Sequence, residues 1–325
     1  MPKKKLQTTD SNSVDFGGIV VEGAYPAIDR VPIGLWSLDR ALGGGWPSRV
    51  LSEVFGPNDS CKSTLTYYVS AKISSFYGGN IVLNDLEGLN PEYVANVVRV
   101  AGYTGKIRLV PSTVEEKGKN VPLPVEESLK LMIDWFADEN SVTAILDSVS
   151  MVSSEQEMEG DIGDANMGKR AFIMGQTVRA VRRWLRNREK PGNVFFVNHL
   201  FPNMGFAGST TVGGNMIKNG SAVRVSLKVK EKTDSDARIV HGKVEKLRFR
   251  LPETTKEFEF CTIPGFGVHP GLSAIRDCVS QGLAEETSGR INLNGKSYGF
   301  YKTLTDNYED VEIFRPFIKA LEGFK

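Results

Sequence analysis

The chain has 325 residues, of which 40% are apolar and 24% are charged, and its formal net charge is +1. This length and composition predict a soluble enzyme with one large core and room for a small satellite domain. The balanced charge excludes a global attraction for polyanions, so a polyanionic partner would have to bind to a local patch of positive charge. Three cysteines without metal-type spacing favour a reducing cytosol over a disulfide framework or a zinc site, and no apolar run approaches the roughly 20 residues of a membrane span.

The first 30 residues predict an arm and not a domain, because they are polar at first and then carry only the short apolar run Ile19-Val20-Val21. From Val31 onward, short strand-like runs alternate with longer helix-compatible segments, which is the pattern of an α/β fold with a mostly parallel sheet. The runs are residues 52–55, 81–83, 107–110, 144–146 and 194–197. Ligands in such folds bind at the carboxyl ends of the strands.

A phosphate-binding loop is predicted between the first of these runs and the helix-like segment 65–76. Such a loop points backbone NH groups at phosphate oxygens, with a Lys that reaches the β- and γ-phosphates and a hydroxyl on Mg²⁺. Lys62 and Ser63 supply the last two groups, whereas Cys61 stands where the usual pattern has Gly. The alternative is a surface loop of chance similarity, and the strand before it and the helix after it favour the phosphate site. The whole stretch is Gly56, Pro57, Asn58, Asp59, Ser60, Cys61, Lys62, Ser63 and Thr64.

Three acidic residues follow strand-like runs and are candidates for catalysis. Asp147 ends the run 144–146, which suits a Walker B carboxylate that holds Mg²⁺ directly or through water. Asp85 and Glu87 follow the run 81–83, and ATP hydrolysis needs a group that orients or deprotonates water. We favour Glu87, although either residue could instead cap the segment that begins near Asn90.

Two glycine-containing segments precede or follow clusters of cations. The first, residues 158–168, leads into an Arg-rich helical pattern that no acidic residue interrupts from Lys169 to Arg188. The second, residues 203–215, follows the polar pair Asn198-His199 that closes a strand-like run. A basic helix is as often a solvated face as a nucleic-acid site, but flexible loops beside cations are typical of proteins that hold single-stranded backbones.

With these blocks in this order, the chain resembles the RecA recombinase family, and its phage UvsX-type branch in particular, over about residues 31–268. The blocks are residues 31–45, the loop 56–64, Asp85-Leu86-Glu87, Asp147-Ser148, residues 159–168, Asn198-His199 and residues 210–215. Gly213-Gly214-Asn215, at its distance from the phosphate loop, is more specific than the loop itself. The resemblance implies a RecA-type P-loop ATPase core at 31–268, an N-terminal oligomerisation arm at 1–30 and a small C-terminal domain at 269–325.

The resemblance also implies the roles of individual residues, with ATP and Mg²⁺ as cofactors. Catalysis would involve Glu87 as the activator of water, Lys62 and the switch residue His199, which senses the γ-phosphate. Ser63 and Asp147 would hold the metal, and Asn90 and Tyr93 would contact adenine. Lys246 and Arg248 would reach the ATP of a neighbouring subunit, and the alternative is that they are surface charges on a strand. DNA would be bound by Gly160, Ile162, Gly163, Met167, Gly168, Arg170, Phe206, Gly213, Gly214, Asn215 and Lys218.

The implied function is an ATP-dependent recombination protein that forms helical filaments on single-stranded DNA and promotes pairing and strand exchange with double-stranded DNA. Its implied partners are DNA, further copies of itself, and single-strand-binding and mediator proteins. No membrane partner is implied. We expect it in the cytoplasm, of the host cell if it is a phage protein. Two alternatives stay open: a ring-forming helicase-like motor, and a non-catalytic filament protein, which Cys61 and a shifted carboxylate spacing motivate.

Overall fold

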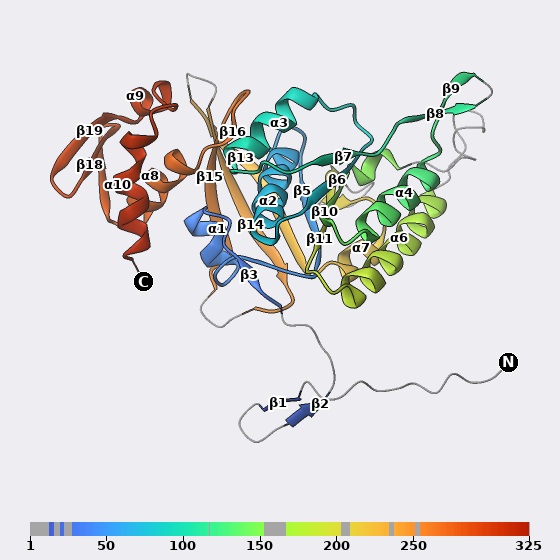
Figure 1. The fold of residues 1–325 in the computed structure, drawn as a ribbon. Coiled ribbons are helices and arrows are strands. Elements are labelled where there is room, and N and C mark those ends of the chain that lie inside the picture. The colour runs from blue at the N-terminus through green and yellow to red at the C-terminus, as the bar shows by residue number, and fades with distance from the viewer. Residues whose placement is uncertain are drawn as a thin grey trace.

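The computed structural model describes residues 13–15, 20–22, 28–116, 118–152, 167–202, 209–233, 237–250 and 254–324. Within these residues, one ten-stranded sheet runs through the molecule (Figure 1). Its strand order is β16-β15-β14-β13-β5-β11-β10-β6-β7, and β12 pairs with β11. The strands are β5 (Leu51–Gly56), β6 (Asn80–Asp85), β7 (Ile107–Leu109), β10 (Ser141–Asp147), β11 (Asn193–Pro202), β12 (Ser209–Thr211), β13 (Val223–Lys232), β14 (Arg238–Leu247), β15 (Glu257–Ile263) and β16 (Gly267–Val268).

The sheet is parallel from β13 to the edge strand β7 and antiparallel from β13 to the other edge strand, β16. The neighbouring pairs from β13 through β5, β11, β10 and β6 to β7 are all parallel. The pairs from β13 through β14 and β15 to β16 are antiparallel. All five strand-like runs of the sequence lie in the parallel part, so the predicted α/β fold with a mostly parallel sheet is confirmed.

Helices cover both faces of the parallel strands, because successive side chains of a strand point to opposite faces. Phe195 and Val197 pack into one apolar cluster, whereas Val194 and Phe196 pack into the other. The first cluster includes side chains of α2 (Lys62–Tyr77) and α3 (Pro91–Val100), and the second includes side chains of α4 (Val125–Ala137) and α6 (Met167–Asn187). The short α7 (Asn215–Gly220) and the 3₁₀ turn η1 (Val149–Met151) also contribute to the second cluster.

The last part of the chain packs against the antiparallel end of the sheet (Figure 1). A third apolar cluster joins Phe314 and Phe317 to Ile239 and Cys261 of the sheet. The elements here are α8 (Pro270–Ser280), β17 (Ala284–Thr287), β18 (Arg290–Leu293), β19 (Lys296–Phe300), α9 (Tyr301–Asp306) and α10 (Val311–Glu322). The strands β17, β18 and β19 form a separate antiparallel sheet. This part therefore shares its core with the large sheet.

Smaller elements complete the described chain. They are α1 (Trp36–Ala41) and three antiparallel pairs: β1 (Ser13–Asp15) with β2 (Val20–Glu22), β3 (Arg30–Val31) with β4 (Trp46–Pro47), and β8 (Thr113–Glu116) with β9 (Lys119–Pro122). Of the apolar run predicted for the arm, Val20 and Val21 lie in β2, and Ile19 is outside the described residues. In the portion of the chain that the structure covers, no helix has both the length and the apolar character needed to cross a membrane.

Candidate functional site

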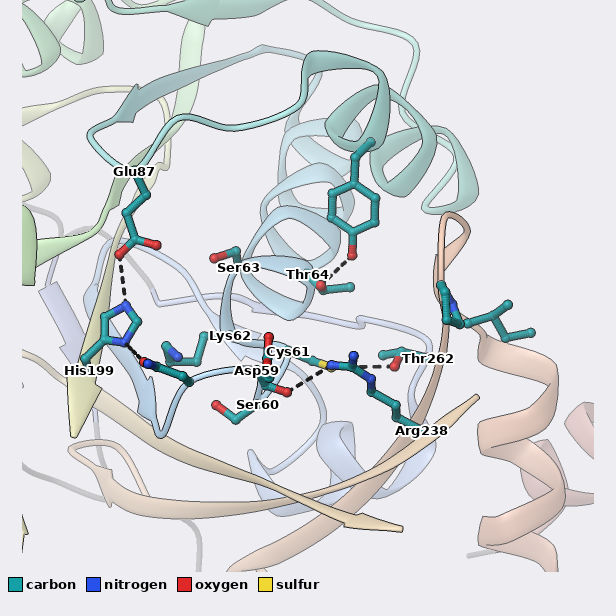
Figure 2. A pocket seen from close by; sticks show the side chains of 14 residues that line it. Asp59, Ser60, Cys61, Lys62, Ser63, Thr64, Glu87, His199, Arg238 and Thr262 are labelled. Atoms are coloured by element: carbon teal, nitrogen blue, oxygen red, sulfur yellow. Dashed lines mark hydrogen bonds and ion pairs between the residues drawn. The ribbon is translucent and has the colours of Figure 1, made fainter. Parts of the chain in front are cut away.

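The carboxyl ends of four parallel strands meet at one edge of the sheet. Asp147 pairs in register with Asp85, and His199 pairs with Gly56. A cavity of about 590 Å³ opens beside these strand ends. Figure 2 shows Glu87 and His199 on one side of it and Arg238 and Thr262 on the other. Its lining residues are Asn58, Asp59, Ser60, Cys61, Lys62, Ser63, Thr64, Glu87, Tyr93, His199, Arg238, Thr262, Ile263 and Pro264.

The loop 56–64 has the geometry of a phosphate-binding loop, since it leaves β5 and ends at the N-terminus of α2. Gly56 has no room for a side chain, because a Cβ there would lie 2.3 Å from the Leu227 carbonyl oxygen. Cys61 adopts φ 62° and ψ 29°, in the left-handed region. This is the conformation that Gly adopts without strain, so the backbone keeps the shape of the usual loop although the side chain is not the usual one.

Lys62 points back across this loop. Its Nζ donates a hydrogen bond of 2.8 Å to the Pro57 carbonyl oxygen, and its side chain is almost fully buried. Burial lowers the pKa of Lys62, and the nearby carboxylates of Glu87 and Asp147 act in the opposite direction. A buried ammonium at the N-terminus of a helix is suited to a polyanionic ligand, because the first NH groups of a helix lack partners within it.

Asp147 is buried at the end of β10, with 2% of its surface exposed. Its Oδ2 accepts a hydrogen bond of 2.7 Å from the Tyr67 hydroxyl, whereas its Oδ1 has no hydrogen-bond partner among the described residues. Burial raises the pKa of Asp147, and the Tyr67 hydroxyl opposes that shift. A buried carboxylate oxygen without a partner, next to a cavity lined by the Ser63 hydroxyl, fits a hard cation such as Mg²⁺.

Asp85 and Glu87 have different surroundings. The carboxylate of Asp85 accepts backbone hydrogen bonds from Glu87, Gly88 and Leu89, so it shapes the turn that follows β6. Glu87 instead extends into the cavity, where its Oε1 lies 2.9 Å from His199 Nε2 and also accepts from the Ser148 hydroxyl. Only the second carboxylate is available to a ligand in the cavity.

The two predicted adenine contacts differ in position. Tyr93 lines the cavity, and its hydroxyl lies 2.6 Å from Thr64 Oγ1. Burial raises the pKa of Tyr93. Asn90 does not line the cavity, because its side chain is the N-cap of α3 and accepts from the backbone NH of Glu92 at 2.9 Å. The proline that follows Asn90 is the sequence signal for such a cap.

Sequence reasoning missed the far wall of the cavity, which comes from the antiparallel end of the sheet. Arg238, Thr262, Ile263 and Pro264 lie there, on β14, β15 and the residue after β15. Arg238 Nη1 donates a hydrogen bond of 3.1 Å to the carbonyl oxygen of Asp59 in the phosphate loop. No motif marks these residues, because strand pairing between distant segments brings them to the cavity.

The segments that border the two predicted DNA loops are tightly fixed. Gly213 and Gly214 have positive φ values of 86° and 78°, and a Cβ on Gly213 would lie 2.4 Å from Ile217 Cδ1. Lys218 Nζ donates to Thr210 Oγ1 at 2.7 Å, and Arg170 Nε donates to the Val152 carbonyl oxygen at 2.5 Å. Gly168 lies in the first turn of α6 and Asn215 opens α7. Gly160, Ile162, Gly163 and Phe206 are outside the described residues, as is the side chain of Met167, which opens α6.

Lys246 and Arg248 do not line the cavity of their own chain. Lys246 Nζ donates to the carbonyl oxygens of Lys218 and Asn219 at 2.8 and 3.1 Å, and Arg248 Nη2 donates to Asn219 at 3.4 Å. Burial lowers the pKa of Lys246, and the neighbouring Arg248 adds to this effect. Both cations thus lie at the C-terminal end of α7, where carbonyl groups and the helix dipole favour positive charge.

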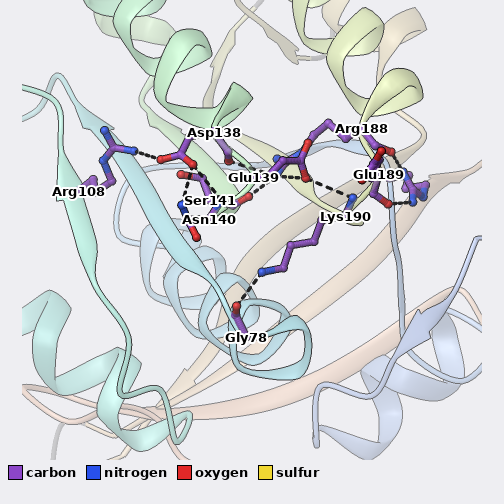
Figure 3. Close-up of polar contacts among 10 residues, drawn as sticks. Gly78, Arg108, Asp138, Glu139, Asn140, Ser141, Arg188, Glu189 and Lys190 are labelled. Carbon is purple, nitrogen blue, oxygen red and sulfur yellow. Dashed lines mark hydrogen bonds and ion pairs between the residues drawn. The ribbon is translucent and has the colours of Figure 1, made fainter.

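A second polar cluster lies at the opposite edge of the sheet, where the strands begin (Figure 3). Arg188 is buried, lies over the Phe136 ring and donates to the Ser141 carbonyl oxygen. Arg49 in turn donates to the carbonyl oxygen of Arg188 at 2.7 Å, and Lys190 Nζ donates to that of Gly78 at 2.7 Å. These contacts to backbone carbonyls fasten the end of α6 to the sheet.

Comparisons with known proteins agree with this geometry. A family model described as the RecA N-terminal domain matches residues 17–267. Protein RecA of Francisella tularensis subsp. novicida (strain U112), of subsp. tularensis (strain SCHU S4 / Schu 4) and of subsp. holarctica (strain LVS) is 28% identical to this chain over 292 residues in each case. The aligned part is 86% of this chain and 76% of each relative. The match includes the phosphate loop, Glu87, Asp147 and His199, and the chain belongs to the RecA family.

Proposed function

We propose that the protein is an ATP-dependent homologous recombination protein that forms helical filaments on single-stranded DNA and promotes pairing and strand exchange. Membership of the RecA family supports a role in DNA recombination in general. The observation that carries the specific proposal is the cavity of about 590 Å³, which is lined by the phosphate loop and the Glu87–His199 pair and beside which the buried Asp147 lies. The order of motifs also favours the phage UvsX-type branch of the family.

In this proposal, the loop 56–64 holds the phosphates of ATP through its backbone NH groups and Lys62. The Ser63 hydroxyl and Asp147 hold Mg²⁺, which supplies charge neutralisation at the phosphates when bound. Tyr93 packs on the adenine ring, opposite the wall that Thr262 and Pro264 form. This assignment is supported by the free Oδ1 of Asp147 and by the position of Tyr93 in the cavity.

Glu87 is the catalytic carboxylate in this proposal, and Asp85 is a structural residue. Both carboxylate oxygens of Asp85 accept backbone NH groups of the turn, so they are already occupied by the structure of the loop. Glu87 faces the cavity and is partly exposed, so a water molecule can reach it. His199, which contacts Glu87, links the site to the second DNA loop through β11 and β12.

DNA binding is assigned to residues 160–168 and 203–215, together with Arg170 and Lys218. The support is the arrangement of their borders: Arg170 fastens the start of α6, and Gly213 and Gly214 make a close turn before α7. Exposed arginines of α6, such as Arg179 and Arg183, supply local positive charge in a chain that is nearly neutral overall. Binding through phosphates should weaken steeply as salt increases.

Filament formation is assigned to a contact in which Lys246 and Arg248 of one subunit reach the ATP of the next. Both residues lie outside their own cavity, on a surface near the second DNA loop, which suits a contact in trans. A head-to-tail contact that does not close produces a helical filament. We assign residues 1–30 to an oligomerisation arm, 31–268 to the ATPase core and 269–325 to a small C-terminal domain, and we propose single-strand-binding and mediator proteins as further partners.

The test is ATP hydrolysis with and without single-stranded DNA, for the wild type and for Glu87→Gln. We expect DNA to stimulate hydrolysis, and the variant to lose about 10²-fold or more of the stimulated rate, as the removal of a general base does. Glu92→Gln is the matched control, because Glu92 is exposed and does not line the cavity. No hydrolysis by the wild type would favour a passive filament protein, and closed rings in electron micrographs would favour a helicase-like motor.

A further inference from the structure

His199 is held from both sides by residues of two loops, one after β5 and one after β6. Its Nδ1 lies 2.8 Å from Oδ1 of Asn58 in the phosphate loop, and its Nε2 lies 2.9 Å from Oε1 of Glu87. The same Oε1 accepts a hydrogen bond from the Ser148 hydroxyl. The structure thus contains a continuous chain of polar contacts from the phosphate loop to the carboxylate that faces the cavity (Figure 2).

The positions of the hydrogens in this series of polar contacts follow from the chemistry of Asn58, His199 and Glu87. An ionised Glu87 only accepts hydrogen bonds, so His199 Nε2 carries a hydrogen. If the ring is neutral, Nδ1 accepts and Asn58 has to present its NH₂ group; if the ring is charged, Nδ1 donates and Asn58 presents its oxygen. An amide satisfies both states by rotating, whereas a carboxylate at position 58 would satisfy only the charged one.

We propose that Asn58 is a positioning residue through which the phosphate loop holds His199, and that His199 and Ser148 together keep Glu87 in a resting orientation. Two hydrogen-bond donors on one oxygen of Glu87 fix the orientation of its carboxylate. A movement of the loop at Asn58 turns the ring and removes one of these donors. The Glu87 carboxylate is therefore free to turn further into the cavity when the loop and His199 separate.

The same contact connects the loop to the second DNA segment. His199 lies in β11, where the next residue, Leu200, pairs with Thr211 of β12. Asn198, on the other side, donates to Glu53 Oε1 and to the Val212 carbonyl oxygen, both at 2.9 Å. A shift of His199 is transmitted along a strand that is fixed to the segment before Gly213. Through His199, Asn58 is connected to the strand next to the second DNA segment, and the role that we assign to Asn58 rests on the function proposed above.

The contact itself is tested without nucleotide or DNA. In the full-length protein labelled with ¹⁵N-histidine, the ring signals of His199 are assigned by substitution of His241 and His269, the other two histidines. Asn58→Asp places carboxylates at both ring nitrogens. We expect the ratio of doubly to singly protonated His199 to rise at least about tenfold at the same pH, and Asn58→Ala to produce no such rise.

A variant at the neighbouring position 59 distinguishes a long-range effect of charge on His199 from direct contact between position 58 and the ring. The charged side chains that share the cavity with His199 are Asp59, Lys62, Glu87 and Arg238. Asp59→Asn changes the charge one residue away from Asn58 without touching the ring, and we expect it to alter that ratio less than about twofold. If Asp59→Asn and Asn58→Asp change the ratio by equal factors in opposite directions, Asn58 does not contact the ring and the inference fails.

The positioning role has its own measurement, the ratio of DNA-stimulated to basal ATP hydrolysis. We expect Asn58→Ala to lower this ratio about tenfold and Asn58→Gln, which keeps the amide, to restore part of it. An unchanged ratio in Asn58→Ala would overturn the role even if the ring signals confirm the contact. If the wild type hydrolyses no ATP, the proposed function fails, and the ring signals still decide whether Asn58 holds His199.

Discussion

The left-handed conformation of Cys61 leads to a prediction about stability that is the reverse of the usual rule. At φ 62° and ψ 29°, a residue with a Cβ is strained by about 1–2 kcal/mol relative to the right-handed region. Gly is free of this strain, but its unfolded chain has more conformational entropy, which costs about 0.5–1 kcal/mol relative to Ala. The strain is the larger effect, so Cys61→Gly should be more stable than Cys61→Ala by about 0.5–1 kcal/mol.

The comparison of Gly with Ala removes the side-chain contact from the result. Cys61 Sγ lies 3.6 Å from Thr262 Oγ1, and both substitutions lose this contact equally. The matched control is Ser75, an exposed residue within α2 that has ordinary helical geometry. There Ala should be more stable than Gly by about 0.5–1 kcal/mol. We therefore expect the Gly variant to be the more stable one at position 61 and the Ala variant to be the more stable one at position 75, at the other end of the same helix.

Urea unfolding followed by circular dichroism measures both differences, provided that the slope of free energy against urea is the same for each pair. The experiment is done at low protein concentration without nucleotide or DNA, so that self-association does not contribute to stability. If Cys61→Ala is as stable as Cys61→Gly, or more stable, the loop does not hold position 61 in the left-handed region, and the account of how this loop tolerates Cys is refuted.

Two further predictions concern a wall of the cavity and a buried carboxyl group. Arg238→Ala should raise the dissociation constant for ATP about tenfold, because a charge-assisted hydrogen bond contributes about 1.5–3 kcal/mol. A titration with fluorescent nucleotide measures this constant, and Lys230→Ala, at an exposed position, is the control. Equal dissociation constants for the wild type and Arg238→Ala would show that Arg238 does not bind ATP. Burial raises the pKa of Asp277 from 3.8 to about 7. Between pH 3.8 and about pH 7, the folded protein therefore keeps a proton on Asp277 that the unfolded chain has released. The stability that this proton contributes is lost as the pH rises through that range. Asp277→Asn should flatten this fall in urea midpoint between about pH 5 and about pH 7.5, and a profile identical to that of the wild type would contradict the assignment.

Local patterns in the sequence predicted much of the parallel core. Each of the five apolar runs became a strand, because both faces of these strands are covered and their residues are continuously apolar. The phosphate loop was predicted from residues adjacent in sequence, whose chemistry and spacing are visible without a fold. The helix after it is longer than the segment 65–76 predicted, since it begins at Lys62 and ends at Tyr77.

Other features depended on contacts between distant residues. Asn90, for which the resemblance predicts a contact with adenine, caps α3 in this structure, and the sequence does not indicate this cap and that contact separately because both suit a polar residue before a proline. The sequence likewise left Asp85 and Glu87 open, since they are two positions apart. The turn geometry, with three NH groups on Asp85, is what supports our proposal of Glu87 as the catalytic carboxylate.

The sequence by itself determined the residue types of the site, namely the phosphate loop with Cys61 in place of Gly, the acidic residues after the strands and His199. The tertiary structure decided which of them share one cavity. It placed Arg238 and Thr262 on the far wall and joined Asn58, His199 and Glu87 in one polar chain. The physical reason is that motif chemistry and strand periodicity are local properties of a chain, whereas a cavity forms where strand pairing brings together segments more than a hundred residues apart.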